Sequence, residues 1–145
     1  MDFALDDVGT ALARAGHDQG AATLFVCSGV TPYLPTPAVE ALLGWIAGHR
    51  SALTSVAFDA IWASVLDGNS PLFGARELCN AVKDVGEPLR WGFPDGQVEE
   101  TLARMGLRAE RILDADAVAA YVARADGSLL ARPYGFSLLV HARPT

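Results

Sequence analysis

The residues best placed to do chemistry in this chain come directly after a short apolar stretch. Thr23 to Cys27 is rich in β-branched and aromatic side chains, which predicts a strand covered on both faces inside an α/β sheet. It ends at Ser28-Gly29, where small residues allow a tight turn, and Thr36-Pro37 then supplies an N-cap and a first helical position. Ligands of open α/β sheets bind beyond the carboxyl ends of the strands, so Ser28 to Leu34 is the predicted site. An ordinary strand-to-helix connection would use the same residue types.

Other kinds of site find less support in the residue spacing. Ser28-Gly29 lacks the G-x-S-x-G frame of a nucleophile elbow. No two of the 14 glycines are spaced as G-x-G, so no loop that cradles a phosphate or nucleoside can be proposed. We expect no metal site, because the histidines have no spacing that would gather them with the two cysteines: His17, His49, His141, Cys27 and Cys79.

Composition excludes several classes of partner. The chain has 145 residues, which predicts one domain, and its net charge is −6 with no cluster of Lys or Arg. This argues against nucleic acid as a partner. Apolar residues make up 51% of the chain, but charged residues, Gly or Pro interrupt every apolar run before it could span a membrane. The acidic start has no signal-peptide pattern, and two cysteines in apolar settings fit a reducing compartment, so we expect a cytoplasmic protein.

The elements that must position the site alternate between helix and strand. Asp6 or Asp7 can cap a first helix, and Asp95 and Asp114 can each cap a later one. The stretch Gly86 to Phe93 predicts a structured connection, in which Trp91 beside Arg90 could line a substrate pocket. The expected strands are Thr23–Cys27, Leu53–Asp59, Leu107–Leu113 and Phe136–Ala142, and the expected longer helices are Pro37–Ala47 and Phe73–Val85.

Five segments carry a resemblance to a known family. In order they are MDFALDD, TLFVCSGVTPYL, SVAFD, GEPLRWGF and RPYGFSLLVHAR. The chain resembles the C-terminal half of the leucine carboxyl methyltransferase family, and most closely its actinobacterial-type branch of S-adenosylmethionine-dependent methyltransferases. The resemblance extends over essentially residues 1–145, which it identifies as a single domain equivalent to half of the family's domain.

The resemblance implies an α/β fold with a partial Rossmann-like class I methyltransferase sheet. The family's strand order is 3-2-1-4-5-7-6, and this chain would supply strands 4-5-7-6, with the last strand antiparallel and helices on both faces. Family strands one and two are absent from the alignment. With them go the glycine-rich cofactor loop and the acidic residue that holds the ribose.

Four site residues follow from the resemblance. Asp2 and Phe3 match the pair that binds the adenine of S-adenosylmethionine, and Ser28 stands where the family usually has a Glu that meets the cofactor's ammonium group. Tyr33 matches a Tyr at the substrate mouth, where it would position the substrate, although it could equally just cover the end of the strand.

Two classes of function remain open. The first is an S-adenosylmethionine-dependent O-methyltransferase that acts on a carboxyl or hydroxyl oxygen of a small molecule and is inactive or incomplete as this chain alone. The second is a non-catalytic, truncated methyltransferase-like module that binds a partner or self-associates. In either case Thr23 to Cys27 would form an unprotected sheet edge, so we expect a homo-oligomer or a complementing chain at that edge.

Overall fold

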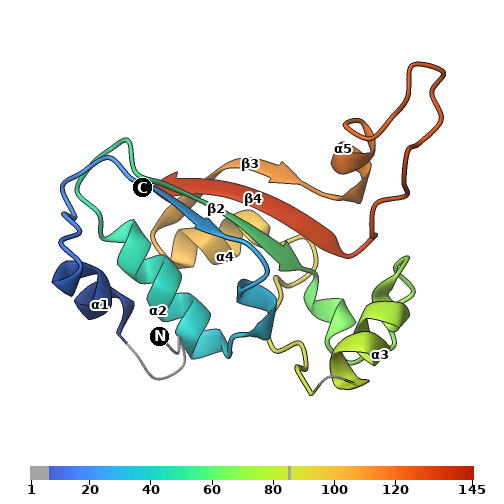
Figure 1. Cartoon of the computed structure of the whole chain (residues 1–145), viewed down its shortest axis with the longest axis horizontal. Helices are drawn as coiled ribbons and strands as arrows, with labels where there is room; N and C mark the ends of the chain where they lie inside the picture. Colours follow the sequence, from blue (N-terminus) through green and yellow to red (C-terminus); the bar gives the residue numbers. More distant parts are fainter. Residues whose placement is uncertain (1–6, 85) are drawn as a thin grey trace.

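The computed structural model describes residues 7–84 and 86–145, which form a mixed α/β domain (Figure 1). Four strands make one sheet, and the helices lie around it. In chain order the elements are α1 (Val8–Arg14), β1 (Leu24–Cys27), the 3₁₀ turn η1 (Thr31–Tyr33), α2 (Thr36–Ala47), β2 (Ser55–Ile61), the 3₁₀ turn η2 (Ala63–Val65), α3 (Ala75–Asp84), α4 (Val98–Arg104), β3 (Leu107–Leu113), α5 (Ala115–Ala119) and β4 (Ser137–Pro144).

The sheet has the strand order β1-β2-β4-β3. β1 and β2 are parallel, whereas β4 runs antiparallel to both of its neighbours, β2 and β3. If β1, β2, β3 and β4 are taken as family strands four, five, six and seven, this is the predicted order 4-5-7-6 with an antiparallel last strand. The prediction is therefore confirmed.

The register between β3 and β4 contains one irregularity. Ala109 lies opposite Ala142, but the next residue of β4, His141, lies opposite Arg111, so Glu110 is an extra residue in β3. Such a bulge increases the local twist and changes where the neighbouring side chains point. As a result Arg111, His141 and Ala57 form one row across the sheet.

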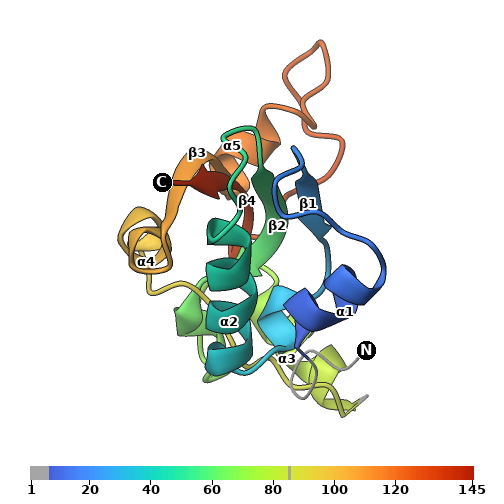
Figure 2. The same ribbon diagram turned by 90° about the vertical axis from the view of Figure 1, so that its left-hand side faces the viewer.

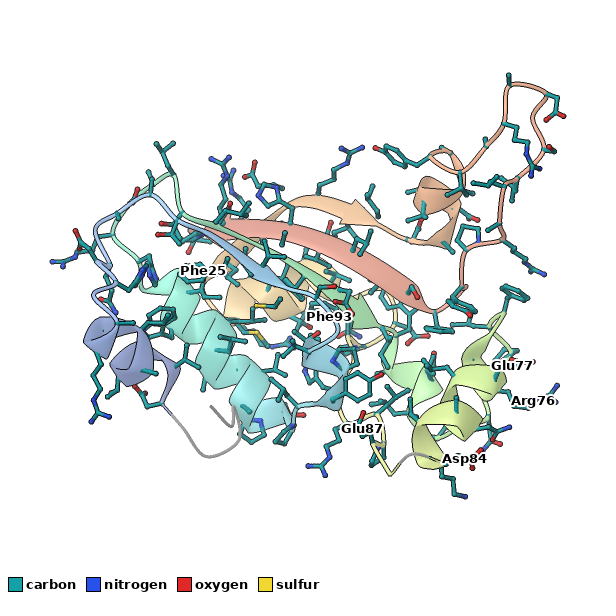
Figure 3. The ribbon with its side chains drawn as sticks, viewed as in Figure 1. Phe25, Arg76, Glu77, Asp84, Glu87 and Phe93 are labelled. Carbon is teal, nitrogen blue, oxygen red and sulfur yellow. The ribbon has the colours of Figure 1, made fainter. Side chains whose placement is uncertain are left out.

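One face of the sheet carries the main core. α2 and α4 lie along this face (Figure 2), and Phe93 is buried beneath the centre of the sheet (Figure 3). Apolar side chains from both helices and from alternate strand positions fill the layer between them. The core includes Val39, Leu42, Leu43, Ile46, Val56, Phe58, Ala60, Trp91, Phe93, Val98, Leu102, Leu107, Leu138, Val140 and Ala142.

The other face of the sheet is mostly open. Among the described residues only the short helix α5 and the loop after it rise on this side, near the end of β3 (Figure 1). On β1, Leu24 is 61% exposed and Val26 is 67% exposed. The prediction that Thr23 to Cys27 is covered on both faces is therefore wrong for the described part of the chain, because α2 and α1 cover only the side that carries Phe25 and Cys27.

An aromatic cluster attaches β1 to α2 and to the loop before β1. Phe25 packs edge-on against Trp45 and His49, with ring centroids 5.5 and 5.0 Å away. Nδ1 of His49 lies 3.0 Å from the carbonyl oxygen of Ile46, so this nitrogen carries the hydrogen. Nε2 of His49 is then an acceptor, and it receives a hydrogen bond from Nε2 of His17 at 2.9 Å. The two imidazoles thus form a hydrogen-bonded pair that closes the cluster.

Helix caps match the sequence prediction in two of four cases. The side chains of Asp7 and Asp114 accept hydrogen bonds from the backbone at the starts of α1 and α5. Thr36 is the first residue of α2 rather than its cap, because Pro35 takes that position. Asp95 does not cap α4, because its carboxylate accepts a hydrogen bond from the Ser64 N–H and so joins this loop to η2.

The contact between α1 and α2 predicts opposite effects for two glycine substitutions. Ala normally stabilises a helix by about 1 kcal/mol relative to Gly. A Cβ on Gly9 would overlap the Trp45 ring, whereas a Cβ on Gly44 meets nothing within 4 Å. We expect Gly44→Ala to raise the free energy of unfolding by up to about 1 kcal/mol and Gly9→Ala to lower it by about 1–3 kcal/mol. Urea unfolding of both variants tests this, and stabilisation by Gly9→Ala would contradict the observed α1–α2 contact.

Candidate functional site

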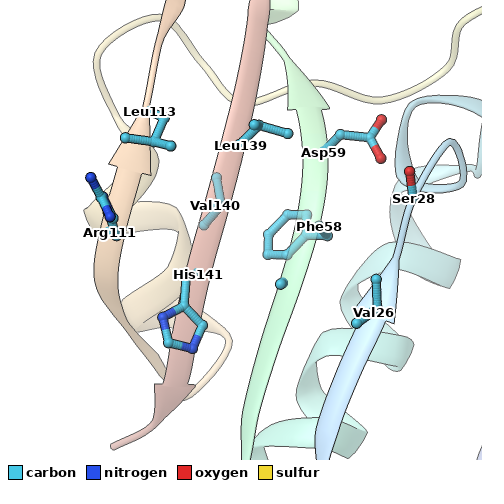
Figure 4. A pocket seen from close by; sticks show the side chains of 10 residues that line it. Val26, Ser28, Phe58, Asp59, Arg111, Leu113, Leu139, Val140 and His141 are labelled. Carbon is cyan, nitrogen blue, oxygen red and sulfur yellow. The ribbon is translucent and has the colours of Figure 1, made fainter. Parts of the chain in front are cut away.

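The predicted site at the end of β1 is organised by Asp59 of β2. Ser28 directly follows β1 and is exposed, and the next residue, Gly29, has a φ of 66°, which favours glycine. The Gly29 N–H donates to Oδ1 of Asp59 at 2.5 Å. This bond brings the Asp59 carboxylate beside Ser28 (Figure 4). Two polar groups therefore lie side by side just beyond the last residue pair of the parallel β1–β2 ladder, Cys27 and Phe58.

The backbone of Asp59 also holds the loop after β1. Its carbonyl oxygen accepts a hydrogen bond from Oγ1 of Thr31 at 2.6 Å, and Thr31 is completely buried. The Pro32 carbonyl accepts from the backbone N–H groups of Arg90 and Trp91, at 2.7 and 3.2 Å. The loop is thus fixed on one side by β2 and on the other by the predicted connection at 86–93.

The structure does not bring the predicted site residues together in one place. Ser28 lines a hollow on the open face of the sheet, whereas Tyr33 is half-buried in η1 and does not line that hollow. Asp2 and Phe3 lie outside the described residues, so their predicted adenine contact stays a prediction. Asp59 was not among the site residues predicted from the sequence. The sequence pattern could have predicted it, because Asp59 directly follows the stretch SVAF in the same way that Ser28 directly follows TLFVC.

The hollow has an apolar floor and polar groups at its two ends. Its volume is about 290 Å³, and all four strands contribute to it (Figure 4). Ser28 and Asp59 lie at the β1 side, and Arg111 and His141 lie at the β3 side. The apolar lining comes from Val26, Ala57, Phe58, Leu113, Leu139 and Val140.

A second cavity lies on the helix side of the domain. It measures about 640 Å³ and runs between α2, α4 and the segment 90–94. Trp91 is buried and lines it together with the exposed Arg90, while Arg104 is held by Glu100 and Thr101 at 3.0 and 3.1 Å. Trp91 and Arg90 therefore line a pocket, as the sequence suggested, but that pocket is separate from the hollow beside Ser28.

Two further observations concern the described residues as a whole. Nowhere in 7–84 and 86–145 do three or more His, Cys, Asp or Glu side chains come together as metal ligands would. Over the same ranges, no helix combines the length and the apolar composition needed to cross a membrane.

Comparison with family models gives one match. The model described as leucine carboxyl methyltransferase matches residues 1–47, a range that includes the loop with Ser28 and Tyr33. The predicted resemblance to this family is thus confirmed over that range. None of the curated proteins matches the chain.

Solved structures share the fold at low sequence identity. The pyocyanin biosynthetic protein PhzM is 17% identical with a TM-score of 0.51, and the match covers 95% of this chain and 38% of PhzM. The mitomycin 7-O-methyltransferase MmcR is 16% identical with a TM-score of 0.51, covering 94% of this chain and 38% of MmcR. LepI, solved in complex with SAM, is 12% identical with a TM-score of 0.50, covering 97% of this chain and 35% of LepI.

These likenesses and the strand order define the class of the fold. The described sheet is part of a class I methyltransferase fold. The chain spans less than two fifths of the length of each of these three structures.

The reactivity of the Cys27 thiol tests whether the negative charge of Asp59 acts at the end of β1. Burial raises the pKa of the Cys27 thiol, and the negative charge of Asp59 raises it further. The thiol therefore stays protonated at neutral pH and reacts slowly with alkylating agents. Asp59→Asn keeps a side-chain oxygen for the Gly29 N–H but removes the charge, so it should lower the pKa of Cys27 and speed its labelling by iodoacetamide at pH 8.

Cys79 is the internal control for this measurement. Burial and the charge of Asp67, not Asp59, raise the pKa of its thiol. Peptide mass spectrometry should therefore show faster labelling of Cys27 with no change at Cys79. An unchanged rate at Cys27 would mean that the Asp59 charge does not act on the end of β1.

Proposed function

We propose that this chain supplies the half of an S-adenosylmethionine-dependent O-methyltransferase that contains family strands four to seven, and that it is incomplete alone. The observation that carries the proposal is the sheet β1-β2-β4-β3, with its antiparallel β4, in a fold shared with methyltransferases. The family match over residues 1–47 supports the carboxyl group as one acceptor, and the likeness to MmcR, a 7-O-methyltransferase, supports O-methylation more generally. The substrate would be a small molecule with a carboxyl or hydroxyl oxygen.

The residues at the end of β1 fit one part of the cofactor. When bound, S-adenosylmethionine supplies a sulfonium methyl group. The exposed Ser28 hydroxyl can accept a hydrogen bond from the cofactor's ammonium group, but it lacks the charge of the family's Glu, a loss of about 1.5–3 kcal/mol. The Asp59 carboxylate beside it supplies a negative charge, and its oxygens have further lone pairs besides the one that Gly29 uses. In this proposal Ser28 and Asp59 share the role of the single Glu.

Methyl transfer to the acceptor oxygen requires few catalytic groups from this chain. A carboxylate is already ionised at neutral pH, so methyl transfer to it needs alignment rather than a base. Tyr33 is the proposed positioning donor. Its place in η1 is fixed because its N–H donates to the Val30 carbonyl and because Thr31 and Pro32 beside it are buried. Asp2 and Phe3 keep their proposed contact with the adenine.

A second candidate function is supported by the exposed edge and face of β1. The Ser55 N–H donates to the Thr23 carbonyl, so the backbone groups of the alternate residues Leu24 and Val26 point away from β2. Within residues 7–84 and 86–145 these groups have no strand partner, and the strand itself has no Lys, Pro or bulge to protect the edge. A module that binds a partner through this edge, without catalysis, would use the same strand. In either function, we propose that a strand of a complementing chain pairs with β1.

Calorimetry with S-adenosylmethionine tests whether the cofactor site of the isolated chain is incomplete. Most polar partners of the cofactor belong to the absent strands, so we expect no measurable binding at micromolar concentration. A dissociation constant in the low micromolar range would contradict the incomplete site. Asp59→Asn and Ser28→Ala would then show whether this binding uses the proposed ammonium contacts.

Hydrogen exchange tests the proposed edge without knowledge of the partner. In dilute solution the outward-pointing amides of Leu24 and Val26 should exchange fast, and those of Phe25 and Cys27, which face β2, should exchange more slowly. Any chain that pairs with β1 should slow the first pair selectively. Equal protection of all four amides in the dilute monomer would mean that the edge is already covered.

A further inference from the structure

The open face of the sheet has a pattern of side chains that the proposed function does not use. The ladder registers place Val26, Ala57, His141 and Arg111 in one row across the four strands. In the next row along, Asp59 lies opposite Leu139, and Leu139 lies opposite Leu113. The face thus has an apolar centre, with a cation toward the β3 margin and an anion toward the β1 margin.

The apolar centre is unusually exposed. Leu139 is 48% exposed in addition to the exposed Leu24 and Val26, although all three are large apolar side chains on a sheet. Contiguous exposed apolar patches on a sheet mark an interaction surface. The hollow between them, about 290 Å³, is at the lower limit for enclosing a small molecule. It can instead receive a side chain that protrudes from another protein surface.

We propose that a second copy of this chain covers the open face, with the two faces packed against each other around a two-fold axis. Arg111 and Asp59, the two charged residues that line the hollow, are self-complementary. A single two-fold rotation that brings Arg111 of one copy to Asp59 of the other also forms the reciprocal pair. The next row of this face carries Arg143 of β4 opposite Arg108 of β3, and each forms an ion pair with Glu110. The whole chain carries a charge of −6, which repels a second copy, but the centre of this face contributes one Arg and one Asp, which balance.

The segment after β3 extends this surface. α5 and the loop that follows rise beside the open face (Figure 1), and Tyr121 and Leu130 are exposed on this segment. The Tyr121 hydroxyl contacts the Arg111 guanidinium, so the segment and the sheet meet at this residue. A stable interface buries about 800 Å² per partner, more than four short strands offer, so contacts with this segment are needed. We expect a dimer with a dissociation constant on the order of micromolar.

The dimer would compete with the complementing chain of the proposed function, but its formation does not require that function. A complementing chain that pairs with β1 and lies over the sheet would occupy the same face. The second copy and the complementing chain would then exclude each other. Ser28 and Asp59 line the shared hollow, so the dimer would also close off this end of the predicted site.

Sedimentation velocity over a concentration series tests the proposal. The wild-type chain should shift from monomer to dimer in the micromolar range, and Leu139→Lys should weaken the dimer at least tenfold. Leu53→Lys is the matched control, because Leu53 is 69% exposed but lies in the loop before β2 and not on the face. Val26→Lys is the second face variant, and circular dichroism confirms that each variant is folded. Arg111→Glu should weaken the dimer as well, since it places two carboxylates opposite each other.

The edge of β1 is the competing interface and has its own variants. Leu24→Pro removes an outward N–H that Leu24→Ala keeps, and both remove the same side chain. If Leu24→Pro and Leu24→Ala dimerise with equal affinity and Leu139→Lys loses the dimer, the result supports packing through the face. A dimer lost only in Leu24→Pro would show that the copies pair through the edge, and it would overturn the proposal. A wild-type monomer at all concentrations, or a dimer that Leu139→Lys and Val26→Lys leave intact, would overturn it too.

Discussion

The sheet depends on the position of β4 between β2 and β3. β3 has no direct pairing with β2, so every backbone hydrogen bond that joins β3 to the rest of the sheet passes through β4. Because successive side chains of a strand point to opposite faces of the sheet, the alternate residues Leu138, Val140 and Ala142 of β4 all point into the core between the sheet and the helices α2 and α4. The same alternation sends Leu139 and His141 to the opposite face. One strand therefore closes the core and also builds the centre of the open face.

The uneven covering of this sheet gives its two faces different roles. The covered face holds a continuous apolar cluster and gains its stability from burial. The open face keeps apolar side chains in solvent, which a stable monomer of this size does not need. β1 combines three features: a covered side with Phe25, an open side with Val26 and, among the described residues, an edge with no strand partner. It is therefore the element through which another chain would most directly affect the domain.

The predicted site lies just beyond the parallel pairing of β1 and β2, and hydrogen bonds hold its loop although Ser28 is exposed. Asp59 contributes its carboxylate to Gly29 and its carbonyl to Thr31, so one residue fixes both ends of the tight turn. The Pro32 carbonyl then attaches the turn to the segment that begins at Arg90. Ser28 is left exposed beside a carboxylate, on a loop that these hydrogen bonds attach to β2 and to the segment at Arg90.

The sequence by itself predicted the boundaries of β3 and the family resemblance, and that resemblance in turn implied the strand order. Local patterns carry this information: apolar stretches, Gly and Pro at turns, and motifs in a fixed order. It did not reveal that Leu24 and Val26 are exposed, because Leu24, Phe25, Val26 and Cys27 are all apolar and no alternation separates the two faces. Nor did it show that Asp59 holds Gly29 or that Asp95 bonds Ser64 instead of capping α4. Only the tertiary structure decided these points. The two hydrogen bonds join groups 30 and 31 residues apart, and the exposure of Leu24 and Val26 depends on which elements pack against each face of the sheet.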